Sequence, residues 1–167
     1  VLGPRVEQFV LAAPSNYRQT SLDAPPPFTA DHPAMLRALR QSVHVDADRQ
    51  YALGYSLGGY ASWAVACLHA DELAGAAPLA SIYCIPPMDD GLWRLMVPNF
   101  QHLPILNVWG ERDELAVQAI DGSLAGTISA LNRRLAAWMR GLAPLLENVE
   151  QPRAGHGDVL EAPVLVE

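Results

Sequence analysis

The sequence predicts an α/β protein in which helices flank a mostly parallel sheet. Short apolar runs that end in turn residues recur along the chain, at 6–13, 51–55, 73–80 and 103–109. Segments with a helical spacing of apolar residues separate several of these runs. This alternation is typical of a parallel sheet, because each helix carries the chain back to the start of the next strand. With 167 residues, half of them hydrophobic, the chain can bury a core and is one domain at most.

The first predicted elements are a strand over 6–13, which ends at Pro14, and a helix that begins near Asp31 and runs to about His44. Segment 15–30 between them has no apolar period and contains three consecutive prolines, so we expect a stiffened loop. One face of the helix carries the apolar residues Met35, Leu36, Leu39 and Val43.

The most informative stretch is 51–60, where a short apolar strand passes into a helix through a glycine-rich turn around Ser56. A tight strand-to-helix turn brings backbone segments together, so only very small residues fit two positions before and two positions after the serine. Gly54 and Gly58 occupy these two positions. Such a turn exposes the serine hydroxyl as a nucleophile. The N–H of Leu57, at the positive end of the helix, is then expected to form half of an oxyanion hole.

This stretch resembles the nucleophile elbow of the α/β-hydrolase superfamily. The acidic turn at Asp46 and Asp48, followed by Ser56-Leu57-Gly58-Gly59-Tyr60-Ala61-Ser62-Trp63, is similar to the branch of polyhydroxybutyrate depolymerase-like and feruloyl-esterase-like enzymes. The resemblance implies an α/β-hydrolase fold and a triad in the chain order serine, acid, histidine.

After the elbow helix we expect a buried strand over 73–80 and then an apolar segment, 81–102, without a clear period. This segment is either core or a substrate-binding cap over the carboxyl end of the sheet, and we favour the cap slightly. In the cap interpretation, the substrate-binding side chains are Tyr83, Met88, Trp93 and Phe100, together with Tyr55 beside the serine.

The last predicted elements are a strand over 103–109, a helix capped by Thr127 or Ser129 that ends near Arg140 and Gly141, and a strand over 148–152. Asp113 follows the first of these strands, and His156 follows the last one in a glycine-flanked loop.

Among the five histidines, His156 is the candidate base for Ser56. His32, His44 and His69 lie near predicted helix ends, and His102 precedes a strand at the wrong end of the sheet. A serine hydroxyl needs a base within hydrogen-bond reach, and a histidine base needs an acceptor that fixes its tautomer.

Asp113 is the predicted acceptor, because it matches the superfamily's placement of the acid. Glu111 and Glu114 are sequence neighbours that we interpret as exposed loop charges. Asp158 is too local to orient the histidine from behind, and we expect it to cap the segment that follows.

The resemblance also implies elements that this sequence does not contain. The 6–13 strand and the helix after it match the fourth strand and its helix in the superfamily, so three strands and the loop with the second oxyanion donor are expected before Val1. We therefore expect residues 1–167 to form a single, partial α/β-hydrolase domain, unless the sheet is a reduced one that closes differently.

Composition excludes some functions. The net charge of −7 and the lack of a basic run argue against nucleic-acid binding, and no apolar run is long enough to span a membrane. Cys67 and Cys84 are too few for a disulfide framework or a metal cluster. We expect no metal or organic cofactor, and the compartment and oligomeric state stay open.

The sequence thus predicts a serine hydrolase that cleaves small carboxylic esters. The alternatives are a serine peptidase of the prolyl-oligopeptidase type and a non-catalytic binding module with the same fold.

Overall fold

The computed structural model describes residues 9–13, 28–83, 95–119 and 122–161. Its centre is a four-stranded parallel sheet in the order β1-β2-β3-β6, formed by Tyr51–Tyr55, Gly75–Leu79, Ile105–Gly110 and Leu146–Gln151. β1 and β6 are the two edges of this sheet, and all of its pairings are parallel. The α/β class predicted from the sequence is therefore confirmed.

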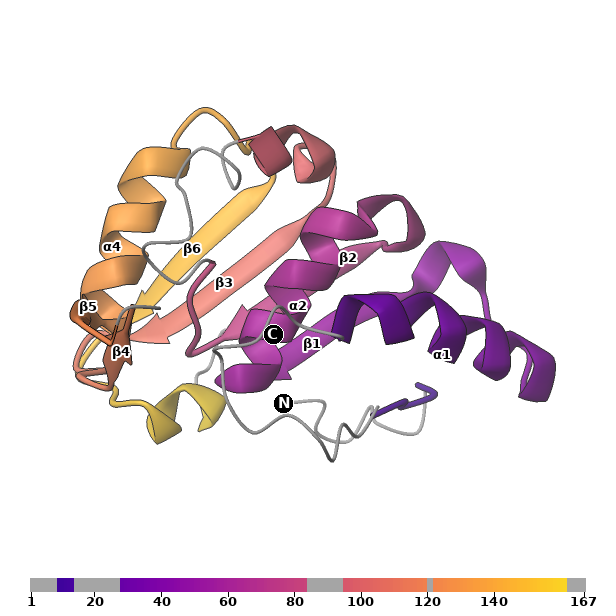
Figure 1. Cartoon of the computed structure of the whole chain (residues 1–167), viewed down its shortest axis with the longest axis horizontal. Helices are drawn as coiled ribbons and strands as arrows, with labels where there is room; N and C mark the ends of the chain where they lie inside the picture. The colour runs from indigo at the N-terminus through magenta and orange to yellow at the C-terminus, as the bar shows by residue number, and fades with distance from the viewer. Residues whose placement is uncertain (1–8, 14–27, 84–94, 120–121, 162–167) are drawn as a thin grey trace.

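The helices whose bounds lie within the described residues are α1 (Phe28–Ser42), α2 (Leu57–Leu68) and α4 (Ile128–Met139). They lie on one side of the sheet (Figure 1). One buried cluster on that side contains Trp63 and Cys67 of α2, Leu135 and Met139 of α4, and Ile105 of β3. Because strand residues alternate between faces, Leu79 and Val108 point to the opposite face. There they pack with Val159 of the short 3₁₀ helix η5 (Gly157–Glu161).

Local chemistry sets the ends of these elements. The Thr127 hydroxyl caps α4 by accepting from the N–H of Ala130 at 3.3 Å, so of the two predicted caps, Thr127 and Ser129, the structure uses Thr127. Gly141, with φ +83°, lies just beyond the other end of the same helix, where a left-handed conformation favours glycine. Further 3₁₀ turns are η2 (Ala47–Arg49), η3 (Ala70–Glu72) and η4 (Val97–Phe100).

The structure corrects the prediction of a first strand over 6–13. Residues 6–8 lie outside the described part of the chain, and residues 9–13 join neither described sheet. Their side chains are exposed, with Leu11 at 65%. An apolar composition alone does not make a strand, because a strand also needs a neighbour that pairs with its backbone groups.

The structure also differs from the prediction at the start of α1 and in a hairpin that the sequence did not indicate. α1 begins at Phe28, three residues before the expected start at Asp31. The antiparallel hairpin of β4 (Ala116–Gln118) and β5 (Leu124–Thr127) was not predicted. Its strands are too short to show a period of two, and in Figure 1 the hairpin lies beside the start of α4.

Candidate active site

Ser56 lies in a strained turn between β1 and α2. Its φ of +54° is a backbone conformation that residues with a side chain rarely adopt. Its N–H donates to the carbonyl oxygen of Leu79 at 2.8 Å, which ties the turn to the end of β2. Ser56 thus leaves the sheet at the carboxyl end of β1, directly before Leu57 opens α2.

Of the two glycines expected to be crowded around Ser56, the structure confirms Gly54 but not Gly58. A β-carbon at Gly54 would collide with the carbonyl oxygen of Gly58, as expected for a tight turn. A β-carbon at Gly58 itself would meet no atom within 4 Å, so the space there does not require glycine. Gly59 is the second crowded position, because its β-carbon would lie 2.5 Å from Oγ of Ser81 and 2.8 Å from the carbonyl oxygen of Leu79.

His156 lies within hydrogen-bond reach of both Ser56 and Asp113. Its Nε2 is 3.0 Å from Oγ of Ser56, and its Nδ1 is 2.7 Å from Oδ2 of Asp113. Asp113 is fully buried, whereas the His156 side chain is 25% exposed. The three side chains follow β1, β3 and β6, and the carboxyl ends of parallel strands meet at one edge of a sheet.

Backbone contacts hold the Asp113 turn. Oδ1 of Asp113 accepts from the N–H of Leu115 at 3.3 Å, which leaves Oδ2 for the histidine. The carbonyl oxygen of Asp113 accepts from the N–H of Ser129 at 3.1 Å, so the first turn of α4 holds the turn from the other side.

Of the three rival carboxylates, Glu114 is exposed, and Glu111 and Asp158 have structural partners of their own. Glu111 accepts from the N–H of Arg153 at 2.6 Å, and Arg153 has a φ of +62°. Asp158 accepts from the N–H of Gly155 at 2.7 Å, so it closes the loop before His156 rather than capping the segment after it. Both contacts fix the loop that carries the histidine.

Gly110 brings the acid turn and the histidine loop together. A β-carbon there would collide with the carbonyl oxygen of Ala154 and would lie 2.7 Å from that of Gly155. The N–H of Arg112 donates to the same Ala154 oxygen at 2.9 Å. Gly110 was not among the predicted site residues, although a glycine at the end of a buried strand is a recognised signal of close backbone approach.

A buried network of asparagines beside the site was not predicted either. Nδ2 of Asn107 on β3 lies 3.0 Å from the side-chain oxygens of both Asn132 on α4 and Asn148 on β6. Asn132 in turn donates to the carbonyl oxygens of Ser81 and Ile128. The network fixes α4 against the sheet, next to the Asp113 turn. Its signal in the sequence is an asparagine on the apolar face of the helix.

The residues expected to bind substrate do not lie together in one described pocket. Met88 and Trp93 lie outside the described residues. Tyr83 and Phe100 are each 1% exposed and pack edge-on against each other, at 5.8 Å between ring centroids, beside Trp63. These two side chains belong to the core between α2 and α4 rather than to an open pocket, because burial of their large apolar surface stabilises the fold. Tyr55 contacts His156 instead.

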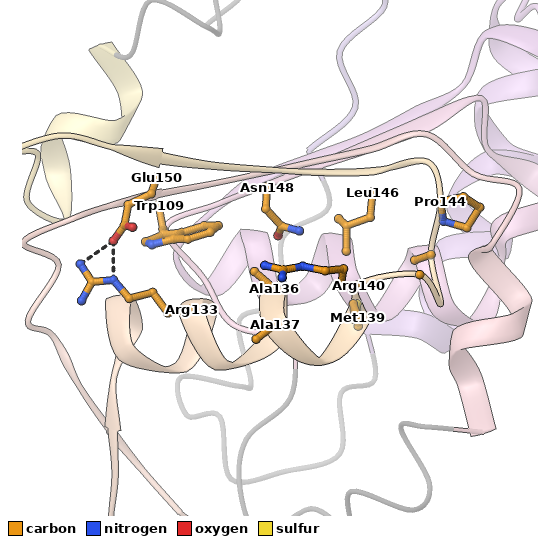
Figure 2. A pocket seen from close by; sticks show the side chains of 12 residues that line it. Trp109, Arg133, Ala136, Ala137, Met139, Arg140, Pro144, Leu146, Asn148 and Glu150 are labelled. Atoms are coloured by element: carbon orange, nitrogen blue, oxygen red, sulfur yellow. Dashed lines mark hydrogen bonds and ion pairs between the residues drawn. The ribbon is translucent and has the colours of Figure 1, made fainter.

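A separate groove lies between α4 and β6, with a volume of about 530 Å³ (Figure 2). Ala136 and Ala137 line it from α4, Arg140 from just beyond the end of that helix, and Asn148 from β6. Arg133 and Glu150 form an ion pair across one end. Its lining contains none of Ser56, Asp113 and His156. Within the described residues, no cluster of three or more His, Cys, Asp or Glu side chains is arranged to hold a metal ion.

Comparison with known structures identifies the architecture. A ferulic acid esterase matches 83% of this chain and 57% of its own, with a TM-score of 0.59 and 14% identity. A thermostable esterase matches 78% of this chain and 30% of its own, with a TM-score of 0.57 and 18% identity. The chain has the α/β-hydrolase fold. SOBER1 of Arabidopsis thaliana, at 16% identity and a TM-score of 0.53, shares it over 77% of this chain and 54% of its own.

At the sequence level, this chain with the α/β-hydrolase fold is 32% identical over 82 residues to NocK of Nocardia uniformis subsp. tsuyamanensis, which carries the name of an esterase. The match covers 49% of the chain and 22% of NocK, and no family model matches. The chain therefore spans less than a third of NocK and of the thermostable esterase. In the described residues, no helix has the length and apolar character that crossing a membrane requires.

Proposed function

We propose that this chain carries the catalytic centre of a serine hydrolase that cleaves carboxylic esters through an acyl-enzyme intermediate. The observation that carries the proposal is the continuous contact from Ser56 through His156 to the buried carboxyl group of Asp113. The likeness to esterases supports an ester as the substrate.

In the proposed reaction, Oγ of Ser56 attacks the ester carbonyl carbon while its proton passes to Nε2 of His156. The carboxylate of Asp113 accepts a hydrogen bond from the Nδ1–H of His156 and stabilises the imidazolium. The carbonyl oxygen becomes an oxyanion, to which the N–H of Leu57 donates. The first N–H groups of a helix have no partner inside it, and the helix dipole adds positive potential there.

His156 then donates its proton to the leaving alcohol, and the acyl group stays on Ser56. A water molecule next gives its proton to His156 and attacks the acyl carbon, and the proton returns to Oγ of Ser56 as the acid leaves. Each proton therefore moves only between the reactants and the side chains of Ser56 and His156, and both side chains end in their starting protonation states. No step requires a further acid or base.

A fluorophosphonate probe tests the proposal, because it forms a covalent bond only with an activated serine. We expect the purified protein to be labelled on Ser56 and to hydrolyse p-nitrophenyl esters, and Ser56→Ala and His156→Ala each to remove nearly all of the ester hydrolysis and the labelling. The double variant should be little worse than either single one, since a nucleophile and its base act as a unit. Ser42→Ala is the matched control, because its hydroxyl donates to Ala38 on the exposed side of α1.

Two outcomes would contradict the proposal. An unlabelled Ser56 in a folded protein would point to a non-catalytic module. Labelling with cleavage of short peptides but no cleavage of esters would favour a peptidase.

A further inference from the structure

Tyr55 contacts His156 in two ways. It is the last residue of β1 and directly precedes Ser56. Its ring centroid lies 5.1 Å from that of His156, with the planes tilted by 46°. Its hydroxyl donates to the carbonyl oxygen of His156 at 3.3 Å. One side chain therefore contacts both the ring and the backbone of the proposed base.

The hydroxyl is suited to remain a donor. Burial raises the pKa of Tyr55, and the negative charges of Asp113 and Asp158 raise it further. The phenol thus keeps its proton at neutral pH, and its bond to the carbonyl of His156 persists over the range in which a histidine titrates.

The other hydrogen bonds of the histidine loop hold the backbone of residues 153–155, which precede His156. Glu111 holds the N–H of Arg153, Arg112 donates to the carbonyl of Ala154, and Asp158 holds the N–H of Gly155. These contacts anchor the loop to the end of β3 and to itself. Tyr55 instead links His156 to β1, the strand that carries Ser56, so it bears directly on the 3.0 Å distance between Nε2 and Oγ.

We propose that Tyr55 is a positioning residue for His156 rather than a substrate contact. Its hydroxyl fixes the backbone of the base, and its ring stabilises the imidazolium that forms when Ser56 loses its proton. This inference rests on the proposed hydrolase function. An aromatic face within about 6 Å of a cation stabilises it, and at an exposed site the effect is about two- to fivefold in an equilibrium constant.

Two substitutions separate the ring from the hydroxyl. Tyr55→Phe keeps the ring and removes the donor, whereas Tyr55→Leu removes both. Tyr51→Leu is the matched control, because Tyr51 lies four residues earlier on the same strand face and is 58% exposed. Circular dichroism and thermal melting establish that each variant is folded.

The first measurement follows the imidazole proton signals of His156 by NMR against pH in the substrate-free protein, so it does not depend on turnover. We expect Tyr55→Leu to move the titration midpoint to lower pH by about half a unit, because the charged form loses the ring. Tyr55→Phe and Tyr51→Leu should leave the midpoint in place.

The second measurement separates kcat from KM for a p-nitrophenyl ester. We expect kcat to fall about threefold in Tyr55→Phe and about tenfold in Tyr55→Leu, with KM within twofold of the original value. A raised KM with an unmoved titration midpoint would make Tyr55 a substrate contact and overturn the inference. An unchanged kcat in Tyr55→Phe would overturn the role of the hydroxyl, even if Tyr55→Leu does not fold.

The inference and the hydrolase proposal fail in different ways. If Ser56 does not react with a fluorophosphonate but Tyr55→Leu still moves the His156 midpoint, the positioning contact is supported and the hydrolase proposal fails. If Ser56 reacts and the midpoint does not move, the inference on the ring fails and the hydrolase proposal stands.

Discussion

A β-carbon at Gly110 would collide with the carbonyl oxygen of Ala154, so the end of β3 and the loop that carries His156 meet along bare backbone. This close approach lets Asp113, three residues after Gly110, reach the imidazole from behind.

Gly110→Ala should therefore push the acid turn away from the histidine loop. Overpacking of this kind costs about 1–3 kcal/mol, so we expect a lower free energy of unfolding and an ester hydrolysis rate that falls more than tenfold. Urea unfolding and initial rates measure the two effects. Gly157→Ala is the control, because its β-carbon would meet no atom within 4 Å. Equal effects of the two substitutions would refute the close-packing explanation.

Asp113→Asn tests which acid orients the base. The amide keeps the shape of the side chain but removes the charge and favours the wrong imidazole tautomer, so we expect kcat to fall on the order of 10⁴-fold while the protein stays folded. Asp158→Asn and Glu111→Gln should cost far less activity, because these carboxylates bind the backbone of the loop. If either of them loses 10⁴-fold while Asp113→Asn does not, the acid is misassigned.

His32 on α1 gives the stability a pH dependence. Burial lowers its pKa from the ordinary value of 6.5, and the nearby His69 lowers it further, while Glu72 opposes the shift. The ring centroids of His32 and His69 lie 5.5 Å apart. The folded state therefore favours neutral His32, and the unfolded chain binds more protons.

We expect the free energy of unfolding to decrease as the pH falls below about 6.5 toward the lower pKa of the folded state. Denaturant titrations at pH 7.5 and 5.5 measure this decrease. His32→Gln should reduce the difference between the two pH values, whereas His44→Gln, at an exposed position, should not. A pH dependence that is unchanged in His32→Gln would show that other groups cause it.

Phe100 tests the core assignment that replaced the substrate-pocket prediction. Phe100→Ala should lower the free energy of unfolding by about 3–5 kcal/mol, because it opens a cavity beside Trp63. Leu95→Ala, whose side chain is 76% exposed, should change it by less than about 0.5 kcal/mol. A fully stable Phe100→Ala protein with an altered preference for acyl length would restore the pocket interpretation.

The sequence by itself determined the α/β class, most strand and helix positions, and the candidate residues Ser56, Asp113 and His156. These features are local. A buried strand shows as an apolar run, and the turn around Ser56 shows its glycines. α4 shows its start in the capping residues Thr127 and Ser129 and its end in Gly141.

Only the tertiary structure decided features that depend on residues far apart in the chain. It showed that Gly59 rather than Gly58 is crowded, that Tyr83 and Phe100 are core, and that residues 9–13 join neither described sheet. It also revealed that Tyr55 contacts His156, 101 residues away. Whether a glycine is crowded, an aromatic ring is buried or a strand is paired depends on the backbone that the rest of the chain brings beside it, and neighbouring residues in the sequence carry little of that information.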